Sequence, residues 1–130
     1  MFRAPALCAV LAGVVIAFAI PHPVMAADMT VQQFLNLGAH VPRNRVAAML
    51  RPETRRLIGE VTDAVSTVKA EQAQAVSSGR RPAHCIPPSG TGITPESLVV
   101  RFESLPQAQR SLTVTQAVRS WMVERYPCPN

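Results

Sequence analysis

The sequence predicts an all-α fold: a small bundle of four to five helices whose last two helices form a hairpin closed by one disulfide. Apolar residues recur at spacings of three and four, as they do along one face of a helix. Several of these runs begin at a capping Thr or an early Pro and end near a Gly or Pro. No segment shows the strict alternation of apolar and polar residues that is typical of a half-buried strand.

The first 26 residues are predicted to be a signal peptide. Arg3 supplies a positive start, residues 4–20 are apolar and uncharged, and small residues up to Ala26 form a cleavage site. The alternative is an uncleaved anchor, because an apolar stretch of 17 residues is at the lower limit for spanning a bilayer. Pro21 and Pro23 next to the cleavage site favour removal. We therefore expect a periplasmic or secreted protein without a stable membrane anchor.

Residues 27–130 are predicted to form a single domain, since 104 residues bury one modest core. This part keeps 12 of the 13 basic residues and all 8 acidic residues, which gives a net charge of +4. An exported protein meets little nucleic acid, so we expect none as a partner. The charge favours peptidoglycan, lipid head groups or an acidic protein instead.

The first predicted helix covers residues 30–39. Thr30 and Gln33 have the spacing of a capping box, in which each side chain satisfies a free N–H of the first turn. Gly38 marks the end of this helix. A second apolar patch at residues 46–50 predicts one or two further helical turns.

The longest predicted helix covers residues 52–76. Pro52 suits a first helical position because its missing N–H costs nothing there. The apolar residues that follow keep to one helical face. Residues 77–92 are rich in Ser, Gly and Pro and predict a linker, which contains Cys85.

Two shorter helices are predicted to follow the linker. Thr94 and Pro95 suit the cap and first position of a helix that Pro106 ends. The last helix runs to residue 126 and begins at either Thr113 or Thr115. These helices could form an antiparallel hairpin through the short segment 106–112.

The cysteines predict one disulfide, between Cys85 and Cys128. Cys8 is lost with the signal peptide, so an even number of cysteines reaches an oxidising compartment. In the predicted hairpin, the start of its first helix lies beside the end of its second. Cys85 precedes that start and Cys128 follows that end, so the disulfide would close the open end of the hairpin.

No pattern of catalytic or metal-binding residues is recognisable, and we expect a protein that is not an enzyme and needs no cofactor or metal. His84 next to Cys85 could be a base beside a nucleophile, but neighbours in sequence seldom have that geometry. A zinc site formed by His40, His84, Cys85 and Cys128 lacks the paired spacing of zinc ligands. A Cys held in a disulfide could serve neither purpose.

Three other features have structural explanations. Glu60 and Asp63 are one turn apart on the long helix and are expected on its solvated face. Trp121 has helical spacing with Val118 and Met122 and is expected to anchor the core. The glycine-rich segment 89–92 lacks the Gly-Lys-Ser/Thr that phosphate cradling requires.

A cluster of arginines is the best candidate for a partner-binding site. Five of them lie within 14 residues: Arg43, Arg45, Arg51, Arg55 and Arg56. The guanidinium fork suits carboxylate and phosphate groups, so the cluster could dock on an acidic surface. The alternative is an ordinary solvated face at a helix start, although positive charge there opposes the helix dipole.

The chain between residues 57 and 128 resembles the Tai-type (Rap/Tai) immunity proteins of type VI secretion systems. The matching segments are residues 58–64, 85–87, 94–99 and 106–110, Ala117, and residues 126–128. The resemblance implies a small periplasmic helical protein that binds and inhibits a peptidoglycan amidase delivered by rival cells. Residues 30–56 show no such match.

The sequence therefore predicts an exported, non-enzymatic inhibitor with a protein partner. A periplasmic stress or envelope-associated protein, which would hold unfolded chains or wall components, is the alternative function. The sequence leaves open whether the protein forms a homodimer.

Overall fold

The computed structural model describes residues 28–130; the predicted signal peptide lies outside them. Within the described residues the chain forms five α-helices and no β-strand. They are α1 (Val31–Gly38), α2 (Arg45–Met49), α3 (Pro52–Ser77), α4 (Pro95–Ser104) and α5 (Val114–Arg125), with the 3-10 turn η1 (Gln107–Gln109) before α5. The all-α prediction is confirmed, and the predicted helix ends agree closely with the observed ones.

Threonine side chains cap the first turn of α1, α4 and α5. Thr30, Thr94 and Thr113 each accept a hydrogen bond from the backbone N–H three residues further on, at 3.2, 3.1 and 3.1 Å. The third residue of each helix returns a bond to the cap's own N–H, which completes a capping box. Of the two predicted starts for α5, the structure thus selects Thr113.

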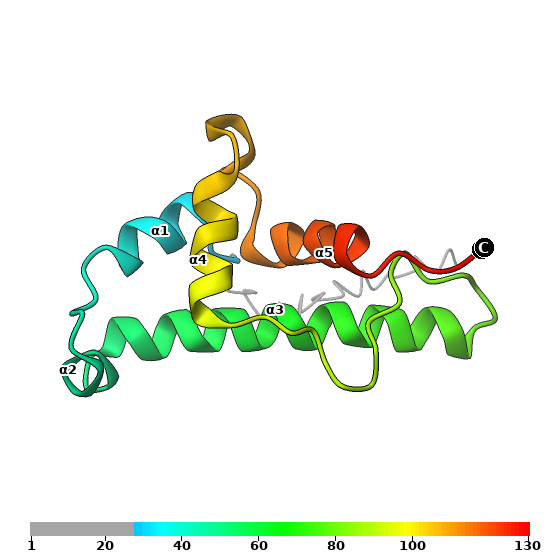
Figure 1. The fold of residues 1–130 in the computed structure, drawn as a ribbon, viewed down its shortest axis with the longest axis horizontal. Helices are drawn as coiled ribbons and strands as arrows, with labels where there is room; N and C mark the ends of the chain where they lie inside the picture. Colours follow the sequence, from blue (N-terminus) through cyan, green and yellow to red (C-terminus); the bar gives the residue numbers. More distant parts are fainter. Residues whose placement is uncertain (1–27) are drawn as a thin grey trace, which may run out of the picture.

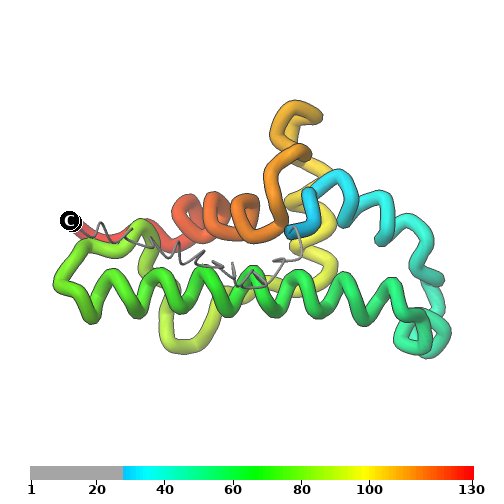
Figure 2. Tube along the Cα trace, turned by 180° about the vertical axis from the view of Figure 1, so that it is seen from behind, coloured from blue at the N-terminus to red at the C-terminus, as the bar shows by residue number. Residues whose placement is uncertain are grey.

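Helix α3 forms the long axis of the molecule (Figure 1). Helix α5 runs alongside α3 in the same direction, while α4 stands steeply across α3. Figure 2 shows the same pairing of α3 and α5 from behind. The main neighbour of α5 is thus α3, whereas the sequence had suggested an antiparallel pairing of α5 with α4.

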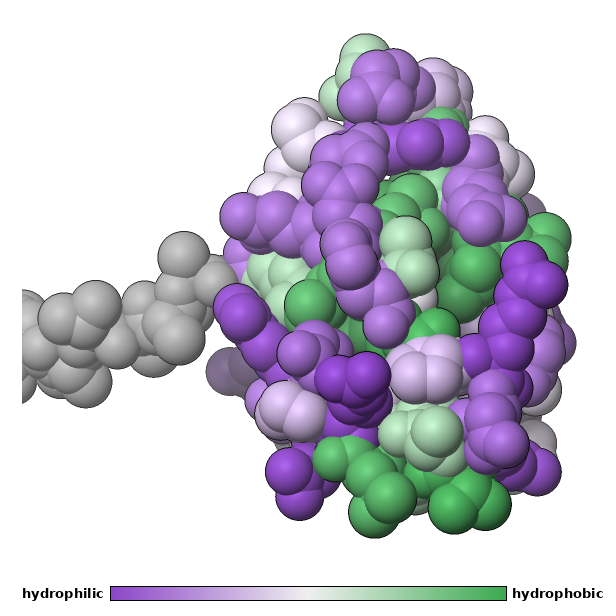
Figure 3. Space-filling model, turned by 90° about the vertical axis from the view of Figure 1, so that its left-hand side faces the viewer, coloured by the Kyte–Doolittle hydropathy of each residue, from purple (hydrophilic) through white to green (hydrophobic). Residues whose placement is uncertain are grey.

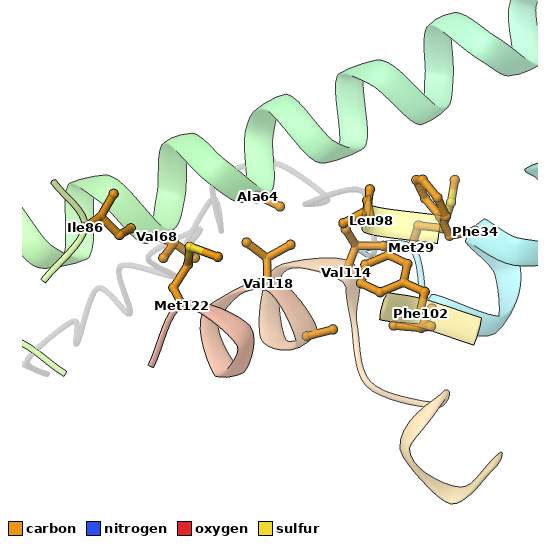
Figure 4. Packing of buried hydrophobic residues seen from close by; sticks show 12 residues of the cluster. Met29, Phe34, Ala64, Val68, Ile86, Leu98, Phe102, Val114, Val118 and Met122 are labelled. Atoms are coloured by element: carbon orange, nitrogen blue, oxygen red, sulfur yellow. The ribbon is translucent and has the colours of Figure 1, made fainter. Parts of the chain in front are cut away.

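The pairing of α3 with α5 has a simple physical reason. Helix α3 offers a buried stripe that is longer than any face of α4, and small Ala64 on it lets the two helices approach closely. Val118 and Met122 on α5 pack against this stripe beside Ala64 and Val68 (Figure 4). Each of these four side chains is fully buried, so the pairing removes a row of apolar side chains from water.

The other end of the core joins α1, α4 and the start of α5. The rings of Phe34 and Phe102 meet edge to face, 5.3 Å apart and at 87°. The backbone N–H of Val114 donates to the carbonyl of Met29 at 2.8 Å, and that of Val31 donates to Leu112 at 2.9 Å. These bonds fix the start of α1 against the start of α5.

The predicted linker after α3 is not a free loop, because Gln72 on α3 binds its backbone. The Gln72 side chain accepts from the N–H of Ile86 at 2.8 Å and donates to the carbonyl of Ile86 at 3.1 Å. Ile86 itself is buried in the core. The linker therefore lies along α3 and brings Cys85 towards the end of α5.

The predicted disulfide between Cys85 and Cys128 is confirmed. Their Cα atoms are 5.0 Å apart, and the N–H of Cys85 donates to the carbonyl of Tyr126 at 2.8 Å. The disulfide joins the linker to the segment after α5, and Figure 1 shows these two segments meeting beyond the end of α5. None of the helices in residues 28–130 combines the length and hydrophobicity that a membrane span needs.

Candidate functional site

An apolar groove lies between α1, α3 and α4. Its volume is about 430 Å³, and it is open to solvent along one side of α3. The side chains that line it are almost all apolar. They come from α1 and the loop after it, from the first half of α3, and from the start of α4 and the two residues before it: Phe34, Gly38, Val41, Thr54, Leu57, Ile58, Val61, Thr62, Ile93, Thr94, Pro95, Leu98 and Val99.

Apolar side chains continue from this groove onto α2. Val46 and Leu50 are 74 % and 76 % exposed, and Ile58 on the groove wall is 50 % exposed. Figure 3 views this end of the molecule and shows apolar side chains gathered at its lower edge, with more of them between hydrophilic side chains above. Apolar side chains that are exposed together at one end of a molecule mark interaction surfaces more often than scattered single residues do.

The structure divides the predicted arginine cluster among several places. Arg51 is the N-cap residue of α3, and Arg55 lies in the first turn of α3, next to Thr54 of the groove lining. Arg43 and Arg45 lie on either side of the α2 cap Asn44. All of these arginines are exposed. Within residues 28–130 none of them forms a salt bridge.

Arg56, the fifth arginine, faces a different hollow. It lies with Gln33, Leu37 and His40 on the opposite side of α1 from the groove. The cluster is therefore continuous in sequence but not on one surface, and only part of it borders the groove.

Two polar atoms at the start of α3 lack partners. The Oγ1 atom of Thr54, which lines the groove, and the Oε2 atom of Glu53 are buried and have no hydrogen-bond partner in the described residues. Buried polar atoms are nearly always paired in folded proteins. This end of the groove is thus polar at Thr54, whose hydroxyl is free to form a hydrogen bond with a bound molecule.

A second group of polar residues surrounds His84 at the other end of α3. Only 2 % of His84 is exposed, and its Nδ1 atom lies 3.0 Å from Oε1 of Gln72. Burial lowers the pKa of His84, while the nearby charges of Glu71 and Arg119 act in opposite directions. A neutral His84 that donates to Gln72 fits this site, and its contacts are those of a structural residue.

Glu71 and Arg119 form an ion pair beside His84. The hydrogen bond from Arg119 lowers the pKa of Glu71, and Glu71 in turn raises the pKa of Arg119. Both side chains are partly exposed. The pair links α3 to α5 on the same face that carries the disulfide.

The residues considered for catalysis or metal binding do not form such a site in the structure. Cys85 is consumed in the disulfide and cannot serve as a thiolate. The exposed His40 follows the end of α1, and its Nδ1 atom lies 2.8 Å from the backbone carbonyl oxygen of Asn36 in that helix. Among the described residues no three His, Cys, Asp or Glu side chains form a group suited to a metal ion.

Two further sequence expectations can be compared with the structure. Trp121 packs against the core as expected, and the guanidinium groups of Arg101 and Arg125 lie 6.0 and 5.9 Å from its ring centre. Asp63 is exposed as expected. Glu60 is not simply solvated, because its Oε1 atom accepts from the N–H of Met29 at 2.9 Å.

The groove itself was not predicted from the sequence. Several of its lining residues, among them Leu57, Val61 and Leu98, have the helical spacing of core positions, which does not show that part of the face stays open. The sequence feature that could have indicated an exposed apolar surface is residues 46–50, which contain more apolar side chains than a helix of two turns can bury. Comparison with known protein families, characterised proteins and solved structures finds no match to this chain.

Proposed function

We propose that this protein is an exported, non-enzymatic binding protein that inhibits a peptidoglycan amidase effector. The observation that carries the binding role is the apolar groove, with its continuation onto α2 and its border of unpaired arginines. Exposed apolar surface of this kind lowers the solubility of a protein, and a partner that covers it is the simplest explanation of its presence. A periplasmic location is part of the proposal, and the disulfide is compatible with it.

The identity of the partner comes from the resemblance to Tai-type immunity proteins. The residues that carry the resemblance have definite places in the fold: Cys85 and Cys128 form the disulfide, and Thr94 caps α4. These residues support a fold in common with the family, and they do not indicate a common partner-binding surface. Residues 30–56, which contribute α2 and much of the groove, lie outside the resemblance. The proposal therefore allows the partner to differ from those of the family.

The test is capture and inhibition. The full-length chain, tagged at its C-terminus and exported by its own cell, is purified from envelope extract, and the proteins bound to it are identified by mass spectrometry. We expect one exported peptidoglycan amidase in stoichiometric amount. The purified protein should also block hydrolysis of peptidoglycan by that amidase, which capture alone would not show.

An envelope chaperone is the second candidate, because exposed apolar side chains such as Leu50 could also hold unfolded chains. That function predicts many substoichiometric clients and suppression of aggregation of unrelated proteins. Recovery of many clients without any amidase inhibition would replace the proposal by this candidate. Peptidoglycan hydrolysis by the protein itself, lost on replacement of Glu60 or Asp63, would overturn both.

A further inference from the structure

We propose that the groove between α1, α3 and α4 receives an amphipathic, acidic helical segment of the partner protein. Its apolar side chains would enter the groove, and its carboxylates would pair with Arg51 and Arg55. This inference rests on the proposed binding function and adds the surface and the chemistry of what it binds.

The groove runs between helices and has a mostly apolar lining. Leu57, Ile58 and Val61 from α3 face Leu98 and Val99 from α4 across it. A helix presents apolar side chains at positions i, i+3, i+4 and i+7, and such a row fits a groove between two helices. The lining contains no charged side chain and is mostly apolar, so it favours apolar inserted side chains.

Two arginines at the start of α3 supply positive charge beside the groove. Arg51 is the N-cap of α3, and Arg55 lies one residue after Thr54 and three before Ile58, both of which line the groove. The arginines therefore lie at the border of the groove. Residues 41–56 contain five arginines and one carboxylate, that of Glu53.

This positive charge is unfavourable in the free protein. It lies at the N-terminal end of α3, where the helix dipole is also positive, so the arginines repel each other and the helix end. A carboxylate placed beside Arg51 and Arg55 would relieve that repulsion and form charge-assisted hydrogen bonds. A basic or neutral segment would gain nothing there, and this selects an acidic partner.

The length of the apolar surface favours a protein segment over a small apolar molecule. Beside α3, Val46 and Met49 of α2 and Leu50 after it are also largely exposed. A molecule that filled the groove alone would leave these side chains in water. A helical segment that continued beyond the groove would cover them.

The test uses the full-length chain, exported and processed by the host cell, and two synthetic helical peptides. The first peptide has leucines at positions i, i+3, i+4 and i+7 and glutamates beside them; the second has lysine in place of each glutamate. Binding is measured by fluorescence anisotropy. We expect the glutamate peptide to bind at least about tenfold more tightly than the lysine peptide, with the preference reduced by salt.

Two pairs of matched variants locate the site. Ile58→Gln should weaken binding of the glutamate peptide about tenfold, whereas Val76→Gln, an exposed apolar residue near the other end of the same helix, should not change it. Arg51→Gln with Arg55→Gln should remove the preference for glutamate over lysine. Lys69→Gln with Arg80→Gln removes the same amount of charge elsewhere and should keep that preference. All these positions are exposed, so circular dichroism should show folded proteins.

Several results would overturn the inference. Equal binding of the two peptides would do so, as would equal effects of Ile58→Gln and Val76→Gln. A dimer in sedimentation that Ile58→Gln dissociates would assign the groove to a second copy. Tight binding of a small apolar dye with no peptide binding would assign it to a small ligand, and a native leader peptide that competes would assign it to this chain's own N-terminus.

Failure of this inference can be told apart from failure of the proposed function. If the captured amidase is inhibited equally by the parent protein, by Ile58→Gln and by the Arg51 and Arg55 double variant, the function stands and the groove is not its site. If the glutamate peptide binds as expected but no amidase is captured, the groove chemistry stands and the proposed partner is wrong.

Discussion

Arg119 on α5 donates two hydrogen bonds to Glu71 on α3: Nε lies 2.8 Å from Oε2, and Nη2 lies 2.6 Å from Oε1. Two parallel bonds between a guanidinium and a carboxylate fix the direction of both side chains. The pair therefore helps to set how α5 lies along α3, next to the buried His84 and the disulfide.

The first prediction concerns this ion pair. Because both side chains are more than a third exposed, at 37 % and 40 %, water screens their attraction. A double-mutant cycle with Glu71→Gln and Arg119→Gln should give a coupling free energy of about 1 kcal/mol in urea unfolding at pH 7.

The coupling should also depend on pH in a defined direction. The pKa of Glu71 is lower in the folded protein than its usual value of 4.5. The stability from the pair is therefore fully present above pH 4.5 and is lost as the pH falls through the lower folded pKa. A coupling energy that persisted unchanged in strong acid would contradict this assignment.

The second prediction concerns His84. Burial lowers its pKa from the usual value of 6.5, so the unfolded chain takes up a proton before the folded protein does. The stability contributed by neutral His84 is present above pH 6.5 and is lost progressively as the pH falls below it. Urea unfolding of the parent protein between pH 8 and pH 5 should show this decline.

A matched pair of variants isolates that effect. His84→Asn should flatten the pH dependence in this range. His40→Asn, which replaces an exposed histidine, should leave it unchanged. The same slope in the parent protein and in His84→Asn would show that another group is responsible.

The third prediction concerns the disulfide. Cys85 and Cys128 are 43 residues apart in sequence, and closing a loop of that length should stabilise the folded protein by about 4 kcal/mol through the unfolded state. Cys85→Ala with Cys128→Ala should lower the free energy of unfolding by that order. Reductant should lower the stability of the parent protein by a similar amount and should have no effect on the double variant.

The fourth prediction compares two glycines. Gly92 has φ +67°, and a Cβ there would lie 2.9 Å from Nη2 of Arg125, so Gly92→Ala should destabilise the protein by about 1 kcal/mol or more. Gly59 lies inside α3 with nothing within 4 Å of its Cβ position. Gly59→Ala should therefore stabilise the protein by about 0.5–1 kcal/mol. Thermal unfolding of both variants measures the contrast, and a loss of stability in both would contradict it.

Much of the fold could be predicted because its signals are local. Thr30 and Thr94 cap helices through residues three positions away, and Pro52 starts α3 whatever surrounds it. The pairing of Cys85 with Cys128 followed from the loss of Cys8 with the predicted leader. The arginine cluster was also visible as a run of like charge, although its role in binding stays a prediction.

Other features depend on which helices meet. The sequence could not show that α5 lies along α3 instead of folding back on α4, because both helices offer apolar faces and the choice depends on which contact buries more surface. For the same reason the groove was hidden: Leu57, Ile58 and Leu98 carry the helical spacing of core residues whether or not another helix covers them.

The amino-acid sequence by itself thus determined the helices, their ends and the disulfide, since caps, prolines and cysteines act over short distances or in pairs. Only the tertiary structure decided which apolar faces are buried and which stay open between α1, α3 and α4. It also separated Arg56 from Arg51 and Arg55, because neighbours in a helix point to different sides. The surface available to a partner is therefore a property of the packed molecule.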